Sequence, residues 1–230
     1  GGSLTDPSGG ASGSNRVRRG GSWNFTGTGL RSAKRQDGTP GGRGDYLGFR
    51  LSLRQTKVEQ PKVPTPGQPW TVPTASIEML WCKPGTFMMG SPKDEKNRQD
   101  NETQHEVTLT KGFYLGKYEV NQAEWLKAMN SKPWENETYA GRVTTASVNH
   151  VLWNQCQEFL VKLNQSSGLK SGMRFALPTE AQWEYACREG GRKVRFCNGK
   201  DEASKSGIHY HRSSKTKPVA SFAPNSLGLY

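Results

Sequence analysis

The sequence predicts an α+β fold with many short strands, two main helices and much irregular loop. Short stretches of alternating apolar residues predict the strands, and polar capping residues at fixed spacing predict the helices. The 230 residues include 27 glycines, which favours a loop-rich chain, while seven Trp, seven Tyr and eight Phe supply large apolar surfaces. Together these features predict short elements packed around an aromatic core.

Residues 1–54 form a first segment that is predicted to end in a β-strand facing a core. The alternation that predicts this strand is seen at Leu47, Phe49 and Leu51. Residues 55–76 follow, and their prolines, set among Gln, Lys and Thr, favour an extended, semi-rigid linker. Residues 77–230 make up the rest of the chain. We expect the two segments to form one domain that the linker ties together.

Two more short strands and a helix are predicted near the middle of the chain. Glu106–Thr110 and Phe113–Leu115 show alternation and β-propensity. A helix is expected to begin after Asn121, a residue type that caps helix N-termini. The apolar residues that share one face of this helix are Trp125, Leu126 and Met129.

Two further helices carry capping signals. Asn154 is followed three residues later by Gln157, the spacing of a capping box, in which each side chain bonds the other residue's backbone N–H. Gly168 can terminate this helix. Thr179 and Gln182 repeat the pattern for a second helix. Capped helices beside short strands favour an α+β fold over alternating βαβ units.

Four motifs of the chain resemble those of one family. They are Arg19-Gly20-Gly21-Ser22-Trp23, Arg31-Ser32-Ala33-Lys34-Arg35, Gly48-Phe49-Arg50 and Leu177-Pro178-Thr179-Glu180-Ala181-Gln182-Trp183-Glu184-Tyr185-Ala186. They resemble the formylglycine-generating (sulfatase-modifying factor) family, whose domain has a C-type-lectin-like fold. In that family the last of these motifs comes first. The chain therefore resembles a circularly permuted domain of this type.

The resemblance also implies that a central strand is missing from both ends of the chain. Pro224–Tyr230 resembles the run that precedes this strand in the family, and the run that follows it resembles Thr5–Gly10 with Asn15–Val17. Removal of a central strand exposes unpaired backbone groups. The alternatives are self-association through that edge, a longer chain that supplies the strand, and a fold repacked without it.

The resemblance implies an oxidase only where the family's cysteine pair is present. Family members that make formylglycine carry two cysteines shortly after the Gly-Gly-Ser motif, where soft thiolates bind copper. The matching stretch here, residues 23–33, contains no cysteine. The sequence therefore argues against catalysis. The alternative is a divergent metal-dependent oxidase that uses other ligands.

No cofactor is predicted from the residues. Members of the family often bind calcium through hard oxygen ligands, but the matching segment, residues 207–214, has no acidic residue, so calcium ligands cannot be named. Cys82, Cys156, Cys187 and Cys197 have no short paired spacing. We expect buried free thiols in preference to a disulfide.

Two loops framed by the motifs are the candidate ligand-binding site. Residues 24–30 and 36–46 resemble the variable region of lectin-fold ligand-binding proteins diversified by retroelements, and loops on a fixed scaffold are where binding tends to reside. The candidate site residues are Asn24, Phe25, Thr26, Thr28, Arg31, Lys34, Arg35, Arg43 and Tyr46. The predicted function is a non-catalytic module that binds a protein or glycan. The alternatives are an ordinary exposed loop and a structural module of a larger surface assembly.

The charge of the chain favours an anionic partner. The net charge is +12, and residues 1–54 and 188–217 each carry nine Lys or Arg against three acids. Such a field attracts acidic protein, acidic glycan or nucleic acid, although a solvated basic surface is an equal alternative. No run of about 18 apolar residues is present, so no membrane span is predicted. No residue pattern identifies the compartment, and only the family resemblance favours an extracytoplasmic or cell-surface location.

Overall fold

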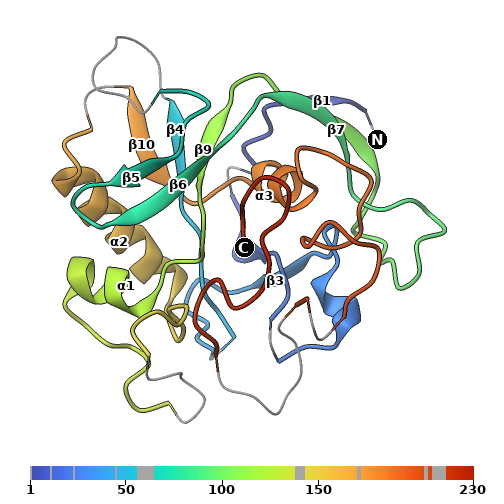
Figure 1. Cartoon of the computed structure of the whole chain (residues 1–230). Helices are drawn as coiled ribbons and strands as arrows, with labels where there is room; N and C mark the ends of the chain where they lie inside the picture. Colours follow the sequence, from blue (N-terminus) through green and yellow to red (C-terminus); the bar gives the residue numbers. More distant parts are fainter. Residues whose placement is uncertain are drawn as a thin grey trace.

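The computed structural model describes residues 2–10, 12–22, 24–44, 46–55, 65–137, 143–169, 172–204, 207–208 and 216–230. The strands are β1 (Leu4–Thr5), β2 (Arg16–Arg18), β3 (Gln36–Gly38), β4 (Ser52–Gln55), β5 (Trp70–Val72), β6 (Ile77–Cys82), β7 (Gly85–Met89), β8 (His105–Leu109), β9 (Phe113–Gly116) and β10 (Met173–Ala176). The helices are the 3₁₀-helix η1 (Gly27–Leu30) and the α-helices α1 (Gln122–Met129), α2 (Trp153–Ser166) and α3 (Glu180–Cys187). The predicted α+β class is confirmed (Figure 1).

The larger sheet has five strands in the order β10-β4-β9-β6-β5, with α1 and α2 packed together on its flank (Figure 1). Strand β4 lies in its interior, antiparallel to both β9 and β10. The strand predicted from Leu47, Phe49 and Leu51 is confirmed only in part. Phe49 and Leu51 are buried, but Leu47 is partly buried and the strand itself begins after them, at Ser52. The Phe49 ring packs edge-on against Trp125 at 5.9 Å and Phe159 at 5.4 Å. The first segment thus contributes to the centre of this core.

The second sheet has three strands in the order β1-β8-β7, and α3 packs against β7 (Figure 1). The two strands predicted near the middle of the chain are confirmed as β8 and β9. Phe87 of β7 meets Tyr185 of α3 with ring centroids 5.3 Å apart. This second core joins α3 to the sheet and so fixes the position of the helix.

Two of the predicted helix starts are confirmed. Asn121 accepts from the backbone of Glu124 at 2.9 Å and Glu124 accepts from that of Asn121 at 2.9 Å, a complete capping box. Thr179 and Gln182 form the same pair at the start of α3. Each cap depends only on residues three apart, which is why the sequence predicts it.

The predicted cap of α2 at Asn154 is wrong by two residues. The helix begins at Trp153, and the backbone N–H of Leu152 donates to Gln155 at 2.9 Å. The backbone N–H of Trp153 donates to Pro40 at 3.2 Å, so a distant loop fixes where the chain enters the helix. The predicted stop is confirmed, since α2 ends at Ser166 and Gly168 has φ +63°.

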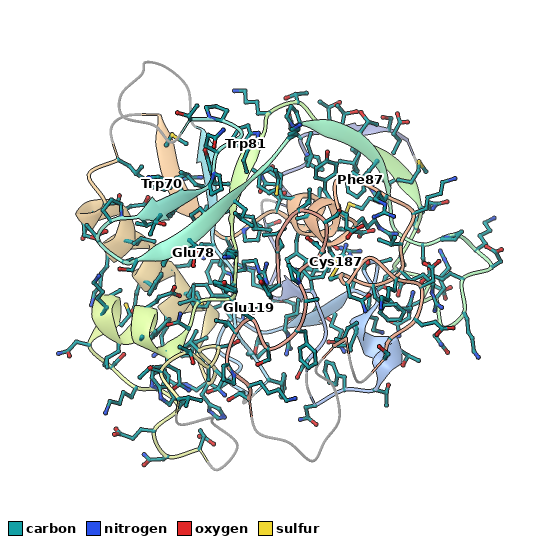
Figure 2. All side chains as sticks on the ribbon, in the orientation of Figure 1. Trp70, Glu78, Trp81, Phe87, Glu119 and Cys187 are labelled. Atoms are coloured by element: carbon teal, nitrogen blue, oxygen red, sulfur yellow. A yellow bond between two sulfur atoms is a disulfide. The ribbon has the colours of Figure 1, made fainter. Side chains whose placement is uncertain are left out.

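The prediction of four free thiols is wrong for two of them. Cys187, at the end of α3 near the centre of Figure 2, forms a disulfide with Cys197. The chain reverses direction between them through Gly190 and Gly191, both at positive φ, and this return brings the two Cα atoms to 4.4 Å. Cys82 and Cys156 are free and buried as predicted, and burial raises the pKa of each thiol to about 12.

The predicted linker is only partly irregular. Residues 56–64 lie outside the described part of the chain, but Trp70–Val72 forms β5 at the edge of the larger sheet. Trp70 stacks on Phe175 at 6.1 Å and, with Trp81, flanks Tyr114 (Figure 2). Burial of aromatic surface therefore continues the sheet into the end of the predicted linker.

Candidate functional site

The two predicted loops meet in the structure. The rings of Phe25 and Tyr46 lie 6.0 Å apart, so one aromatic pair joins the loops. Thr26 and Thr28 are exposed and share a hydrogen bond of 2.9 Å between their hydroxyls. Arg43 is also exposed, whereas Asn24, Phe25 and Tyr46 are partly buried. These six predicted residues lie on the two adjoining loops that form the candidate face.

The first loop is held by tight backbone contacts. Ser22 accepts from the backbone N–H groups of Asn24, at 3.1 Å through its hydroxyl, and Phe25, at 3.0 Å through its carbonyl. Gly21 has φ +63°, and a Cβ atom there would lie 2.5 Å from the carbonyl oxygen of Gly29. Only glycine accommodates both conditions. The Gly-Gly-Ser motif thus sets the path of η1, while its Trp23 lies outside the described residues.

Arg31 is buried and does not belong to the exposed face, which corrects its prediction as a contact residue. Its guanidinium forms a two-point ion pair with Glu102 at 2.7 and 2.8 Å. It also bonds Glu95 at 2.5 Å and the carbonyl of Asn97 at 2.6 Å. Burial alone would lower the pKa of Arg31, but these hydrogen bonds raise it. Arg31 therefore holds the loop of residues 92–104 against the base of the candidate face.

The charge of Glu102 is fixed by the same contacts. Burial favours its neutral form, but the hydrogen bonds from Arg31 and from the Ser91 hydroxyl, at 2.8 Å, outweigh burial and lower the pKa. Sequence reasoning missed Glu102 because the polar loop that carries it has no motif. Its partner lies 71 residues away.

Arg35 also attaches the candidate face to the scaffold, and Lys34 precedes it in the chain. Arg35 bonds Glu180 through two nitrogens and the carbonyl of Asn101 at 3.1 Å. Lys34 is partly buried, and burial together with the charge of Arg31 lowers its pKa against the opposing charge of Glu102. Both are partly buried, as are Asn24, Phe25 and Tyr46, and both remain predicted contacts.

Arg19 completes this support and was not predicted as a site residue. Its guanidinium forms ion pairs with Glu180 at 2.6 Å and with Glu184 at 2.8 Å. Glu184 is fully buried and also pairs with Arg188 at 2.9 Å. The first residue of the Arg-Gly-Gly-Ser motif is thus clamped to α3. The motif was the sequence signal from which a role for Arg19 could have been predicted.

The second loop is anchored to the start of α2. Pro40 accepts from the backbone of Trp153 at 3.2 Å, and Gly44 accepts from that of His150 at 3.1 Å. The prediction of a loop is wrong for Gln36–Gly38, which form β3 and pair with β2, Arg16 opposite Gly38 and Arg18 opposite Gln36. Asp45 lies outside the described residues. The second loop is therefore fixed at two points of the scaffold.

The residues around the face do not fit copper. The sequence from Asn24 to Gly44 contains no cysteine, and the two nearest buried carboxylates, Glu95 and Glu102, are taken by Arg31. In the part of the chain that the structure describes, no three His, Cys, Asp or Glu side chains gather as a metal site. Calcium ligands also remain unassigned, because most of residues 207–214 falls outside that part.

The candidate face is not one of the best-formed hollows of the molecule. Two such hollows each enclose about 260 Å³. One lies between β1 and the start of α3, and the other lies between α1 and α2. Within the described residues, no helix combines the length and apolar character needed to cross a bilayer.

Comparison with known proteins identifies the family of the chain. The model of the sulfatase-modifying factor enzyme 1-like domain matches residues 67–230. The chain belongs to this family. The match leaves out residues 1–66, so the permuted order of the segments stays a prediction. The formylglycine-generating-enzyme-like character predicted from the motifs is confirmed.

Three known proteins are similar to the chain. Formylglycine-generating enzyme of Mus musculus is 26% identical, over 69% of this chain and 56% of that enzyme, so the chain spans about half of this curated relative. The solved structure of PvdO from Pseudomonas aeruginosa is 26% identical with a TM-score of 0.54, covering 73% of this chain and 71% of PvdO. Treponema denticola variable protein 1 is 21% identical with a TM-score of 0.50, covering 71% of this chain and 72% of that protein. The last likeness concerns the fold alone.

Proposed function

We propose that this domain is a non-catalytic module that binds a protein or glycan ligand through loops 24–30 and 36–46. The observation that carries the proposal is the meeting of the two loops at the Phe25–Tyr46 pair, above a base of buried ion pairs. Binding residues often lie on exposed loops that a fixed scaffold holds in place. The two loops carry aromatic and arginine side chains, which often anchor interfaces.

The chemistry of the cysteines supports binding over oxidation. Cys82 and Cys156 are buried with raised pKa values, so neither supplies a thiolate at neutral pH. Cys187 and Cys197 are joined to each other. No thiol pair remains near the loops for soft-metal chemistry. The disulfide also supports the expected extracytoplasmic location, since oxidising compartments preserve such bonds.

A binding screen with loop variants tests this function. The purified chain is exposed to a glycan array and to a peptide display library, and each hit is remeasured with Phe25→Ala/Tyr46→Ala and Thr26→Ala/Thr28→Ala. We expect either pair to weaken binding about tenfold or more. The control is Lys127→Ala/Lys162→Ala, which changes the hollow between α1 and α2 instead. Hits that all four loop substitutions leave unchanged contradict the proposal.

Metal analysis tests the competing enzyme function, which the likeness to formylglycine-generating enzyme favours. The chain is purified, dialysed and measured for copper and iron. We expect less than about one metal per ten chains, because the described residues offer no thiolate pair. Stoichiometric copper or iron would favour the divergent oxidase.

Self-association remains part of the proposed behaviour. The two sheets described above have outer strands, among them β1 and β5, whose edges can pair with another strand. Light scattering across a concentration series tests it. A constant monomer mass would exclude self-association in that range.

A further inference from the structure

Arg16 forms a fixed cationic contact beside the candidate face. Its Cζ lies 4.7 Å from the centroid of the Trp153 ring. Its Nη1 also donates to the carbonyls of Gly13, at 2.7 Å, and Asn15, at 3.1 Å. A guanidinium that is stacked and hydrogen-bonded loses less conformational freedom on binding than a free side chain does. Arg16 is therefore pre-organised.

Arg18 lies on the same face of β2 as Arg16, because side chains two apart in a strand share a face. Its Nη2 donates to the carbonyl of Asp37 at 2.7 Å. A Cβ atom on Gly38 would lie only 1.6 Å from that nitrogen, so the guanidinium occupies the space that a side chain at Gly38 would fill. Two arginines are thus arranged along the β2–β3 sheet.

This arginine surface is continuous with the second loop. Trp153, whose ring lies against the Arg16 guanidinium, donates its backbone N–H to the carbonyl of Pro40 in that loop. Arg43 is exposed three residues further on. We call Arg16, Arg18, Arg43 and Trp153 the arginine ridge.

The charges of the ridge are not neutralised by carboxylates among the described residues. The arginines of the family motifs each meet a glutamate, as in the pairs Arg19–Glu180, Arg31–Glu102, Arg35–Glu180 and Arg50–Glu119. No such pair involves Arg16, Arg18 or Arg43 within the described ranges. The neighbouring Asp37 bonds Asn15 at 2.5 Å, and Glu137 pairs with His150 at 3.2 Å. Arg43 is exposed, whereas Arg16 and Arg18 are partly buried and bond backbone carbonyls rather than carboxylates among the described residues.

We propose that the arginine ridge binds carboxylate groups on the surface of an acidic protein, as an extension of the two-loop face. The inference rests on the proposed function and names the class of its ligand. Planar guanidinium forks match carboxylates in pairs of hydrogen bonds. The ridge supplies these forks, and the adjoining Phe25 and Tyr46 supply apolar contact.

The stacking favours protein over the other anionic partners. Arg16 lies over the Trp153 ring, and a stacked guanidinium competes with the base or sugar that would otherwise stack there. Arginine and aromatic residues are typical of protein–protein interfaces.

The test uses the full chain and three defined anionic probes: a dodecaglutamate peptide, a heparin dodecasaccharide and single-stranded dT12. Binding is measured at about 150 mM salt, where long-range attraction is screened. We expect Arg16→Ala/Arg43→Ala to weaken dodecaglutamate binding about fivefold or more, and Lys127→Ala/Lys162→Ala, which removes the same charge elsewhere, to weaken it less than about twofold. Arg16→Lys keeps the charge but loses the fork, so we expect a loss of about threefold.

The outcomes separate this proposal from the proposed function. Equal losses for the two double variants, or no loss for Arg16→Lys, would overturn the ridge as a specific site. A larger loss for heparin or dT12 than for dodecaglutamate would overturn the assignment to protein. Phe25→Ala/Tyr46→Ala reports on the two-loop face alone. A loss confined to the ridge variants would support the ridge while counting against the loops.

Discussion

The seven arginines of the first 50 residues fall into two groups that differ in surroundings and in role. Those in the family motifs point inward and meet glutamates carried by residues 95–184: they are Arg19, Arg31, Arg35 and Arg50. Those outside the motifs, Arg16, Arg18 and Arg43, lie on the ridge. The motif arginines attach the loops to the scaffold, whereas the ridge arginines are available to a partner.

The comparison shows why a recurring motif need not mark a ligand site. The motif around Arg31 places its arginine where it is buried among Glu95, Glu102 and Asn97. A buried arginine without its partners would leave uncompensated charge. The motif therefore encodes the attachment of the loop, and the residues between motifs encode the exposed face.

Substitution of a motif arginine is expected to cause the largest loss in the free energy of unfolding. Arg31→Ala leaves Glu95 and Glu102 without their cation, and breaking a buried pair in this way costs about 3–5 kcal/mol. Urea denaturation measures the free energy of unfolding. Arg31→Met/Glu102→Leu removes the charges of Arg31 and Glu102 and should restore part of that loss, since Glu95 keeps only the more distant Arg195, at 3.8 Å. A loss below about 1 kcal/mol for Arg31→Ala would place Arg31 with the ridge arginines instead.

Glu180 offers an intermediate test, because it serves two motif arginines. Glu180→Gln removes the charge that pairs with Arg19 at 2.6 Å and with Arg35. We expect a loss of about 1–2 kcal/mol, since the site is partly exposed and Arg19 keeps Glu184. Thermal unfolding measures the change. The adjacent capping pair, Thr179 and Gln182, is untouched, so loss of α3 helicity would contradict the explanation by charge.

Glu124 shows what happens to a partly buried carboxylate that has no arginine partner among the described residues. Burial, with a contribution from the charge of Glu78, raises its pKa to about 7 against the hydrogen bonds of Asn121. The folded state then holds a proton that the unfolded state releases between pH about 4.5 and about 7, so stability falls as pH rises through that range. Glu102, with its lowered pKa, behaves in the opposite sense.

Glu124→Gln should remove this decline while keeping the capping box, since Gln also accepts from the N-cap backbone. We expect the variant to match the parent near pH 4.5 and to be more stable by about 1 kcal/mol at pH 8. Thermal unfolding at a series of pH values measures the difference. Parallel curves for the two proteins would exclude titration of Glu124 as the cause.

The ridge arginines should have the smallest effect on stability. Arg43→Ala is expected to change the free energy of unfolding by less than about 0.5 kcal/mol, as is usual for exposed residues, and Arg16→Ala by about 0.5–1 kcal/mol, because it also loses the contact with Trp153. Denaturant titration of these variants and of Arg31→Ala measures the difference in stability between the two groups. A loss comparable to that of Arg31→Ala would show that the two groups share one structural role.

Features that depend on nearby residues could be predicted from the sequence. The caps at Asn121 and Thr179 each involve a residue three positions away, and the alternation of Phe49 and Leu51 reports one buried face. The start of α2 was missed because Pro40, more than a hundred residues earlier, bonds Trp153. Local pattern does not contain that contact.

The site was predictable as a pair of loops but not residue by residue. The motifs located Phe25 and Tyr46, which the structure brings together. The burial of Arg31 depends on Glu95 and Glu102, which lie 64 and 71 positions away. The Cys187–Cys197 bond likewise depends on how the chain turns after α3. Both features follow from tertiary packing, which the spacing of residues along the chain does not record.

The interior position of β4 has a consequence for the order of folding during synthesis. Ser52 is made 124 residues before Ala176, its neighbour in β10. At about 5–20 residues per second, the ribosome needs about 6–25 s to make that stretch. Until then β4 has no partner on one side, and such distant pairing slows folding. We therefore expect β4 to pair on both sides only after β10 has left the ribosome.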